Sequence, residues 1–385
     1  MTQINDVKED FNFGDKIYLN NASVSLVPKP AIKAMNNFLI QYNALGADSK
    51  TCDSYVNDKL INTRKIISKL INCKPEELVL VNSTTDGINI VANGLNLTSS
   101  SNIITRGGAH EHHANYYPWL NLGKIGAQVK NLKIDENGVF NLVQLENFID
   151  KETKLVSLSH ALYNTGAILP VEEAGIILSE QLIPFLVDAA QTVGCLNSID
   201  VKSIKCDFAA FTGAKWLCGP MGTGILYCKK ESAHLLTPDR IGGESAMIYD
   251  DDKLIYKDIP SKFQTGFRNY VGMVGLAASA EYLSNVGFSN IRNHIMNLAQ
   301  IMREELTNMS NVTIHGPEDP KLRTSIVSFT TSKSADDLVK QLESQGIVLA
   351  TREIYDKKIV RASPHFFNTE EEILHVTSVI KTIIK

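Results

Sequence analysis

The feature that most constrains the fold of this chain is a regular alternation of short apolar runs with longer helical stretches. The apolar or β-branched runs are bounded by polar residues or glycine, and they are Leu78–Val81, Asn102–Thr105, Leu155–Ser159, Phe185–Asp188, Phe208–Phe211 and Gly224–Tyr227. Between them, Ile88–Leu95 and Leu142–Asp150 have apolar residues at helical spacing. Strands that are apolar throughout are covered on both faces, so the pattern predicts an α/β layer with a mostly parallel sheet.

The pattern changes after about residue 255. Helices are expected at Met273–Val286, Asn290–Met309, Ala335–Gln345 and Thr369–Ile384, and strands at Ser325–Thr330, Ile347–Ala350 and Ile359–Ala362. This order predicts a smaller α+β domain. We therefore expect an N-terminal segment at 1–15, a large domain at 16–255 and a small C-terminal domain at 256–385.

Composition narrows the classes of protein that fit. The formal net charge of −4 gives no basic surplus for nucleic acid, and no apolar run is long enough to span a bilayer. The N-terminus lacks a signal-peptide pattern, and the six cysteines are scattered without a C-x-x-C pair, so neither a disulfide framework nor a metal site is expected. A cytoplasmic protein with reduced thiols is the expectation.

Lys215 follows a predicted strand and a turn of small residues. Lysine rarely lies near a core unless it is paired or functional. Desolvation there would lower the pKa of the amine and favour the neutral form that makes a Schiff base. An exposed loop lysine is the alternative interpretation.

Asp188 ends another apolar run, with Gln191 three residues later. Ligands of open α/β sheets bind beyond the carboxyl ends of the strands. Pyridoxal 5'-phosphate needs an acidic partner at its pyridine nitrogen, which Asp188 would provide, while Gln191 could contact the ring hydroxyl. The alternative is that Asp188 only caps the following turn.

Two further segments complete a possible cofactor site. Thr84, Thr85 and Gly87 lie between a strand and a helix, where backbone N–H groups can bind a phosphate, although a plain helix cap explains them as well. His112 and His113 are adjacent and would not chelate a metal from one helical face, whereas an imidazole could stack on an aromatic cofactor or simply face solvent. The 27 residues from Asp188 to Lys215 leave room for one helix-and-strand crossover.

In this order the motifs resemble those of the class V aminotransferase family of fold type I, within its branch of cysteine desulfurases and isopenicillin-epimerase-like proteins. The strings that carry the resemblance span nearly the whole chain and are Tyr18–Ala22, Thr84–Asn89, Glu111–Asn115, Val187–Gln191, Cys206–Phe208, Thr212–Lys215, Gly219–Gly224 and Arg361–Ser363.

The resemblance implies pyridoxal phosphate as cofactor. It implies that Lys215 forms the Schiff base and moves a proton, that Asp188 pairs with the pyridine nitrogen, and that His112 stacks on the ring. Gln191 would contact the ring hydroxyl, and Thr84, Thr85 and Thr212 the phosphate. Arg361 would bind the substrate carboxylate, with Asn21 also assigned to the substrate. A homodimer is implied, in which Gly266, Arg268 and Asn269 complete the partner's phosphate site.

The sequence also departs from the family pattern. Desulfurases carry a nucleophilic cysteine before the Arg-Ala-Ser string, but residues 350–358 contain none. Ala214 replaces the histidine that often precedes the lysine, a loss for which Arg268 or Tyr270 could compensate. Tyr163 occupies the position of a usual asparagine, with Asn164 one residue later, and His160 could be structural.

We therefore expect an enzyme that acts on a small L-amino acid through an external aldimine. Aminotransferase-like chemistry is the first expectation. The alternatives are a desulfurase-like C–S lyase that works by β-elimination without a persulfide cysteine, an amino-acid racemase or epimerase, and a catalytically silent scaffold. The side chain of the substrate and the amino acceptor stay open.

Overall fold

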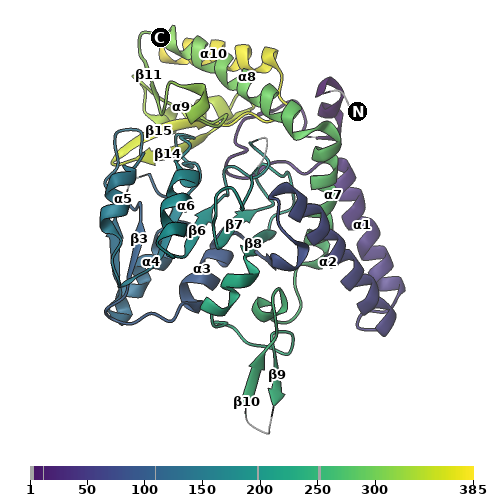
Figure 1. The fold of residues 1–385 in the computed structure, drawn as a ribbon. Coiled ribbons are helices and arrows are strands. Elements are labelled where there is room, and N and C mark those ends of the chain that lie inside the picture. Colours follow the sequence, from purple (N-terminus) through teal and green to yellow (C-terminus); the bar gives the residue numbers. More distant parts are fainter. Residues whose placement is uncertain (1–3, 12, 109, 197–198, 250–252) are drawn as a thin grey trace.

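The computed structural model describes residues 4–11, 13–108, 110–196, 199–249 and 253–385. A large layered part carries a smaller α+β part at one side, and a hairpin projects from the opposite side (Figure 1). Among the described helices, none combines the length and the apolar character needed to cross a bilayer.

The large part is built on a seven-stranded sheet in the order β2-β8-β7-β6-β5-β3-β4. Of the described strands in this sheet, β8 alone runs antiparallel to its neighbours, so the predicted mostly parallel sheet is confirmed. The strands are β2 (Leu78–Val81), β3 (Asn102–Thr105), β4 (Gln128–Asn131), β5 (Thr153–Ser159), β6 (Phe185–Asp188), β7 (Phe208–Thr212) and β8 (Gly224–Cys228).

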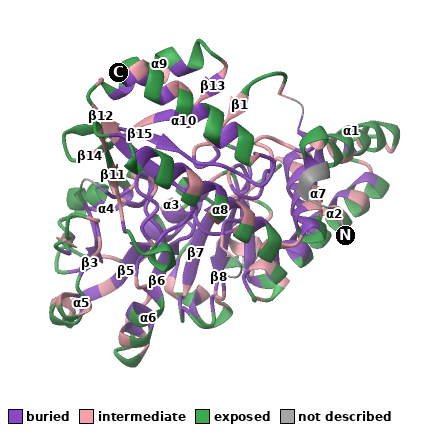
Figure 2. Ribbon diagram, turned by 90° about the horizontal axis from the view of Figure 1, so that it is seen from above, coloured by how far each residue is buried: buried purple, intermediate pink, exposed green. Residues whose placement is uncertain are grey.

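Helices cover both faces of this sheet, because its strands are apolar on both sides. Leu80 packs in one hydrophobic core and its neighbour Val79 in the other, as the alternation of side chains along a strand requires. The strands are therefore buried in the view from above (Figure 2). The helices of this part are α1 (Lys29–Ala44), α2 (Lys50–Leu70), α3 (Thr84–Gly94), α4 (Tyr117–Asn121), α5 (Leu142–Phe148), α6 (Val171–Glu180) and α7 (Tyr270–Val286).

The small part has a four-stranded antiparallel sheet in the order β11-β12-β15-β14. Its strands are β11 (Val312–His315), β12 (Val327–Thr331), β14 (Ala350–Ile354) and β15 (Lys357–Ala362), and its helices are α8 (Phe288–Thr307), α9 (Ala335–Glu343) and α10 (Glu370–Ile384). The N-terminal strand β1 (Ile17–Tyr18) pairs in parallel with β13 (Ile347–Val348), which joins the start of the chain to this part.

The hydrophobic cores divide the chain differently from the ranges expected above. Residue 255 falls inside β10 (Lys253–Tyr256), which pairs with β9 (Ala246–Tyr249) in the projecting hairpin. Beyond it, Met273 and Leu276 of α7 still belong to the core of the large part. The second core contains Leu19 and resumes at Leu298 in α8.

The connection from β6 to β7 differs from the expected helix-and-strand crossover. Its described residues, 189–196 and 199–207, contain turns and no helix. Ala189 and Thr192 begin this run of turns directly after Asp188. A tight turn at this point keeps the Asp188 carboxylate at the sheet edge instead of in a helix cap.

Candidate active site

A cavity of about 310 Å³ lies where the carboxyl ends of β5, β6 and β7 face the small part. It brings together residues from the large sheet, the start of α3, the loop after β1 and two strands of the small part. The lining residues include Ser23, Ser83, Thr84, Thr85, His112, Tyr163, Asp188, Gln191, Thr212, Lys215, Arg352 and Arg361. The cavity therefore brings together seven of the residues predicted for the cofactor, whereas Gly87 of the same phosphate segment does not line it; the seven are Thr84, Thr85, His112, Asp188, Gln191, Thr212 and Lys215.

Lys215 lies in a tight turn after β7. The turn is fixed by hydrogen bonds from the Gly219 N–H to the Gly213 carbonyl (2.7 Å) and from the Cys218 N–H to the Lys215 carbonyl (2.9 Å). Burial lowers the pKa of the Lys215 amine, an effect that the Asp188 carboxylate opposes and the Arg361 guanidinium reinforces. Among the described residues the amine has no hydrogen-bond acceptor, which leaves it available to a carbonyl carbon.

Asp188 ends β6 and is 5% exposed. Its Oδ1 accepts a hydrogen bond from the Ala190 N–H at 2.9 Å. Burial, with a smaller contribution from Glu111, raises the pKa of this carboxyl group. A buried carboxylate with so few donors is stabilised by a cationic partner, and the protonated nitrogen of a pyridine ring is such a partner.

His112 faces the cavity with a neutral ring. Its Nδ1 accepts a hydrogen bond from the Ala114 N–H at 3.1 Å, so the neutral ring carries its proton on Nε2. Burial and the nearby Lys215 amine lower the pKa of His112 to about 4. The ring packs edge-on against Tyr163, with 5.0 Å between the centroids, and an uncharged imidazole held in this way suits stacking on an aromatic ligand.

Gln191 is held from both ends of its amide. Its Nε2 donates to the Ala22 carbonyl at 3.0 Å, and its Oε1 accepts from the Trp216 indole N–H at 2.9 Å. Its second N–H hydrogen is left over for a ligand oxygen in the cavity. These two hydrogen bonds connect the loop around Ala22 to the turn that contains Lys215 and Trp216.

The start of α3 forms an anion-binding corner. Ser83 caps the helix by accepting from the Asp86 N–H at 3.1 Å, and the buried Thr84 Oγ1 has no hydrogen-bond partner among the described residues. Thr85 follows in the first turn, where free backbone N–H groups and the helix dipole favour a phosphate. Thr212 borders the same cavity and donates to the Thr223 carbonyl at 3.0 Å. An unpaired buried hydroxyl beside a helix N-terminus fits a phosphate group.

We expect Gly224→Ala to weaken this corner. A Cβ at Gly224 would lie 2.6 Å from the Ser83 backbone nitrogen, so the strand and the phosphate turn must separate. The cost is about 1–3 kcal/mol of unfolding free energy, with a lower affinity for pyridoxal phosphate. Thermal unfolding and cofactor titration measure both effects. Gly243→Ala, where an added Cβ meets no atom within 4 Å, is the control, and equal behaviour of the two variants would contradict the close approach.

Two guanidinium groups enter the cavity from the small part. Arg361 on β15 is 1% exposed, and it donates to the Tyr163 carbonyl (2.6 Å), to Asn20 Oδ1 (3.2 Å) and to Ser23 Oγ (2.5 Å). Arg352 on β14 donates to the same Ser23 oxygen. Burial, and then Arg352, lower the pKa of Arg361. The Nε of Arg361 is buried and has no hydrogen-bond partner among the described residues, which fits a carboxylate ligand.

Some residues singled out in the sequence lie outside the cavity lining. Asn21 donates to the Ser363 carbonyl (2.8 Å) and accepts from the Ser25 hydroxyl (2.8 Å), so its amide joins the loop after β1 to the residue that follows β15. Arg268 pairs with Glu244 and lies 5.7 Å from the Tyr270 ring centroid. His160 is buried with its Nδ1 unpartnered in the described chain.

Glu111 holds two cavity residues, Ser159 and His112, in place, a role that was not assigned to it from the sequence. Its carboxylate accepts from Ser159 Oγ at 2.5 Å and from the His112 N–H at 2.9 Å, and it pairs with the buried Arg106 at 3.3 Å. Asn164, which follows Tyr163, donates to the Glu353 carbonyl at 2.9 Å and thereby links the two parts of the molecule. A signal for Glu111 existed in the sequence, since it directly precedes His112.

The parallel sheet, the desolvated lysine beside a buried carboxylate, the neutral imidazole and the phosphate corner define a pyridoxal-phosphate-dependent enzyme of fold type I. Comparison with known proteins gives the family. The model described as Aminotransferase class-V matches residues 17–376. The chain therefore belongs to the class-V aminotransferase family, and the predicted fold, cofactor and enzymatic nature are confirmed.

Several proteins similar to this chain are named as cysteine desulfurases. The chain is 33% identical to a probable cysteine desulfurase of Methanothermobacter thermautotrophicus over 96% of this chain and 95% of that protein. It is 31% identical to a cysteine desulfurase of Escherichia coli over 92% of this chain and 90% of that protein. The apo structure of a cysteine desulfurase from Thermococcus onnurineus superimposes with a TM-score of 0.92 at 30% identity, covering 100% of this chain and 98% of that one.

Proposed function

We propose that this enzyme cleaves the C–S bond of a cysteine-type L-amino acid by β-elimination and releases the sulfur product without forming a protein persulfide. The observation that carries the proposal is a cavity with a complete pyridoxal phosphate site and a carboxylate-binding Arg361, but with no cysteine in its lining. The desulfurase names of relatives up to 33% identical support C–S chemistry.

The positions of the cysteines argue against sulfur transfer to the protein. Cys195, Cys206, Cys218 and Cys228 are buried, and burial raises the pKa of their thiols, which disfavours the reactive thiolate. The stretch before Arg361 is a hairpin, with Ile354 paired to Lys357, and it contains no cysteine. None of the six cysteines lines the cavity around Lys215, which supports a reaction without a protein persulfide.

The cavity residues divide the work of elimination. When bound, pyridoxal phosphate supplies the electron sink for the electron pair that remains after Cα loses its proton. Asp188 would hold the ring nitrogen, and the anion-binding corner at the start of α3, with Thr84, Thr85 and Thr212, would hold the phosphate. Gln191 would contact the ring hydroxyl, and His112 would pack on the ring. Arg361 binds the α-carboxylate and so orients the Cα–H bond.

Lys215 then takes the α-proton, and its lowered pKa increases the fraction of neutral amine that can act as the base. The Cβ–S bond breaks with its electron pair going to sulfur, which leaves as a thiol after protonation. For cysteine the balance is cysteine plus water giving hydrogen sulfide, pyruvate and ammonia.

Product analysis tests this reaction against the other candidates. The holoenzyme with L-cysteine should release pyruvate and sulfide in equal amounts. Conversion of bound cofactor to the pyridoxamine form would instead establish the aminotransferase-like reaction. Formation of the D-enantiomer with retention of sulfur would establish a racemase. A persulfide on any cysteine of the chain during turnover would establish desulfurase chemistry.

The substitution Arg361→Gln should raise KM for the amino acid far more than it lowers kcat. A charge-assisted contact to the α-carboxylate is lost, which corresponds to about a 30- to 100-fold loss in kcat/KM. Steady-state kinetics measure the split. Arg292→Gln on α8 is the matched control, because Arg292 does not line the cavity. An unchanged KM in Arg361→Gln would contradict the assignment.

We further propose a homodimer. The hairpin β9–β10 exposes Met247, Ile248 (74%), Leu254 and Ile255, and Phe267 nearby in the chain is 80% exposed. An isolated two-stranded hairpin with apolar side chains is marginal in water, so a second copy of the chain is its natural cover. Residues 266–269 would then complete the partner's phosphate corner. Location in the cytoplasm stays a prediction.

A further inference from the structure

Arg352 is a second guanidinium in the cavity that the reaction above does not use. In the β14–β15 ladder, Arg361 lies opposite Ala350, and Arg352 is two residues further along β14. The two arginines are therefore diagonal neighbours on one face of the sheet, where like charges repel. Such an arrangement is destabilising unless an anion lies between or beside them.

The described chain provides no anion for this pair. Neither arginine forms an ion pair with a described carboxylate, and both donate to the neutral Ser23 hydroxyl. Arg352 makes its other hydrogen bond to the Thr351 carbonyl at 2.6 Å. The only acidic side chain in the lining described is Asp188, and the proposed function already pairs Asp188 with the pyridine nitrogen.

The two guanidinium groups differ in how deeply they are buried, which suggests different roles for them. Arg361 is buried, and its two terminal nitrogens donate to Tyr163, Asn20 and Ser23. Its Nε has no acceptor in the part of the chain that the structure describes. Arg352 is only half-buried and lies nearer the turn of the hairpin, whose residues 355 and 356 are exposed. A ligand that reaches from Arg361 to Arg352 thus extends away from Lys215 toward solvent. One α-carboxylate neutralises one of the two guanidiniums and leaves the other uncompensated.

We propose that the substrate is an L-amino acid whose side chain ends in a second carboxylate beyond the scissile bond, and that Arg352 binds this distal carboxylate. The inference rests on the proposed function for the position of the α-carboxylate at Arg361. Disulfide-linked and S-(carboxyalkyl) cysteines belong to this class. Cleavage of the Cβ–S bond then gives a carboxylate-bearing thiol or persulfide, together with pyruvate and ammonia after reaction with water.

Binding of unreactive ligands to the holoenzyme tests this inference separately from the reaction. Glutarate has two carboxylates, and glutaramate replaces one of them by an amide of nearly the same shape; neither has an amino group to react. Calorimetry should show glutarate binding at least about tenfold more tightly, as one charge-assisted contact implies. Arg352→Gln should abolish that preference, while Arg292→Gln should retain it.

Turnover gives a second readout with a matched substrate pair. S-carboxymethyl-L-cysteine should exceed S-carbamoylmethyl-L-cysteine in kcat/KM by about ten- to hundredfold, and Arg352→Gln should remove the difference through KM. Arg352→Lys, which keeps the charge, should restore part of it. If no pyruvate formed but the protein still bound glutarate more tightly than glutaramate, only the proposed reaction would be refuted.

The result that overturns the inference is equal affinity of the wild type for glutarate and glutaramate. Equal weakening of both ligands by Arg352→Gln would also overturn it, because it would mean that both arginines hold a single carboxylate. Circular dichroism of each variant confirms that the fold is kept before the affinities are compared.

Discussion

Replacement of Lys215 by alanine is expected to reduce pyruvate release by about a thousandfold or more. The variant loses both the amine that attaches the cofactor and the base that takes the α-proton, and proton transfer by a positioned group alone contributes about 10²- to 10⁴-fold. The lowered pKa of Lys215 matters here, since a neutral amine is needed for both roles. The cavity otherwise stays intact, because the Lys215 side chain has no hydrogen bonds among the described residues.

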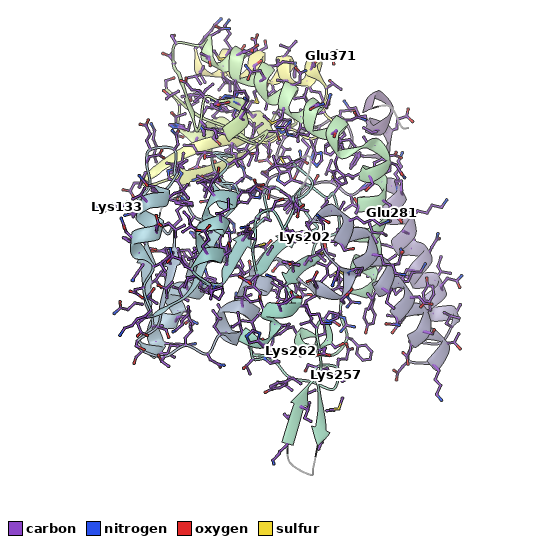
Figure 3. All side chains as sticks on the ribbon, in the orientation of Figure 1. Lys133, Lys202, Lys257, Lys262, Glu281 and Glu371 are labelled. Atoms are coloured by element: carbon purple, nitrogen blue, oxygen red, sulfur yellow. The ribbon has the colours of Figure 1, made fainter. Side chains whose placement is uncertain are left out.

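The matched control is Lys133→Ala. Lys133 lies at the outer edge of the molecule (Figure 3), far from the cavity lining. This variant should retain wild-type rates and wild-type cofactor content. If Lys215→Ala also retained more than about a tenth of the activity, the proton-transfer role would be refuted.

The second large effect is expected for Asp188→Asn, with a loss of about 10²- to 10³-fold in kcat. Asparagine keeps the shape and can still accept from the Ala190 N–H, but it cannot hold a proton on the ring nitrogen. Loss of one partner of a buried charge pair costs about 3–5 kcal/mol, and each 1.4 kcal/mol is a factor of ten. The cofactor should still attach at Lys215, so the variant separates binding from the electron sink.

Asp188→Glu and Asp200→Asn provide the comparison. The glutamate keeps the charge and should recover part of the rate, and Asp200, which caps an exposed turn, should have no effect on turnover. Spectra of the bound cofactor would show whether its ring nitrogen is protonated. A wild-type kcat in Asp188→Asn would mean that the carboxylate is only a turn cap.

The sheet and most of the cofactor site could be predicted from the sequence because both depend on local patterns. Buried strands such as Leu78–Val81 and Phe185–Asp188 are continuous apolar runs, and the structure gives them the same bounds. Asp188 and Lys215 directly follow such runs, so their place at the sheet edge follows from chain order. The turn-only connection between β6 and β7 was not predictable, since its small residues resemble a short helix.

Arg352 shows what the sequence could not provide. Its position in the cavity depends on the β14–β15 pairing, where a strand of mixed polarity places Arg352 diagonally from Arg361. The sequence placed only the end of a strand at Ala350. Asn21 is the opposite case, because the motif Tyr18–Ala22 predicted it at the site. In the structure its side-chain amide is hydrogen-bonded to Ser363 and Ser25, and Ser23 lines the cavity instead.

Chemical reduction of the holoenzyme tests most directly whether Lys215 holds the cofactor, because it makes the bond between the lysine and the cofactor permanent. The holoenzyme would be treated with borohydride, digested and analysed by mass spectrometry. The expected result is one phosphopyridoxyl group on the peptide that contains Lys215, absent from Lys215→Ala. A phosphopyridoxyl group on a different lysine, or an unmodified Lys215 in cofactor-saturated protein, would contradict attachment at Lys215.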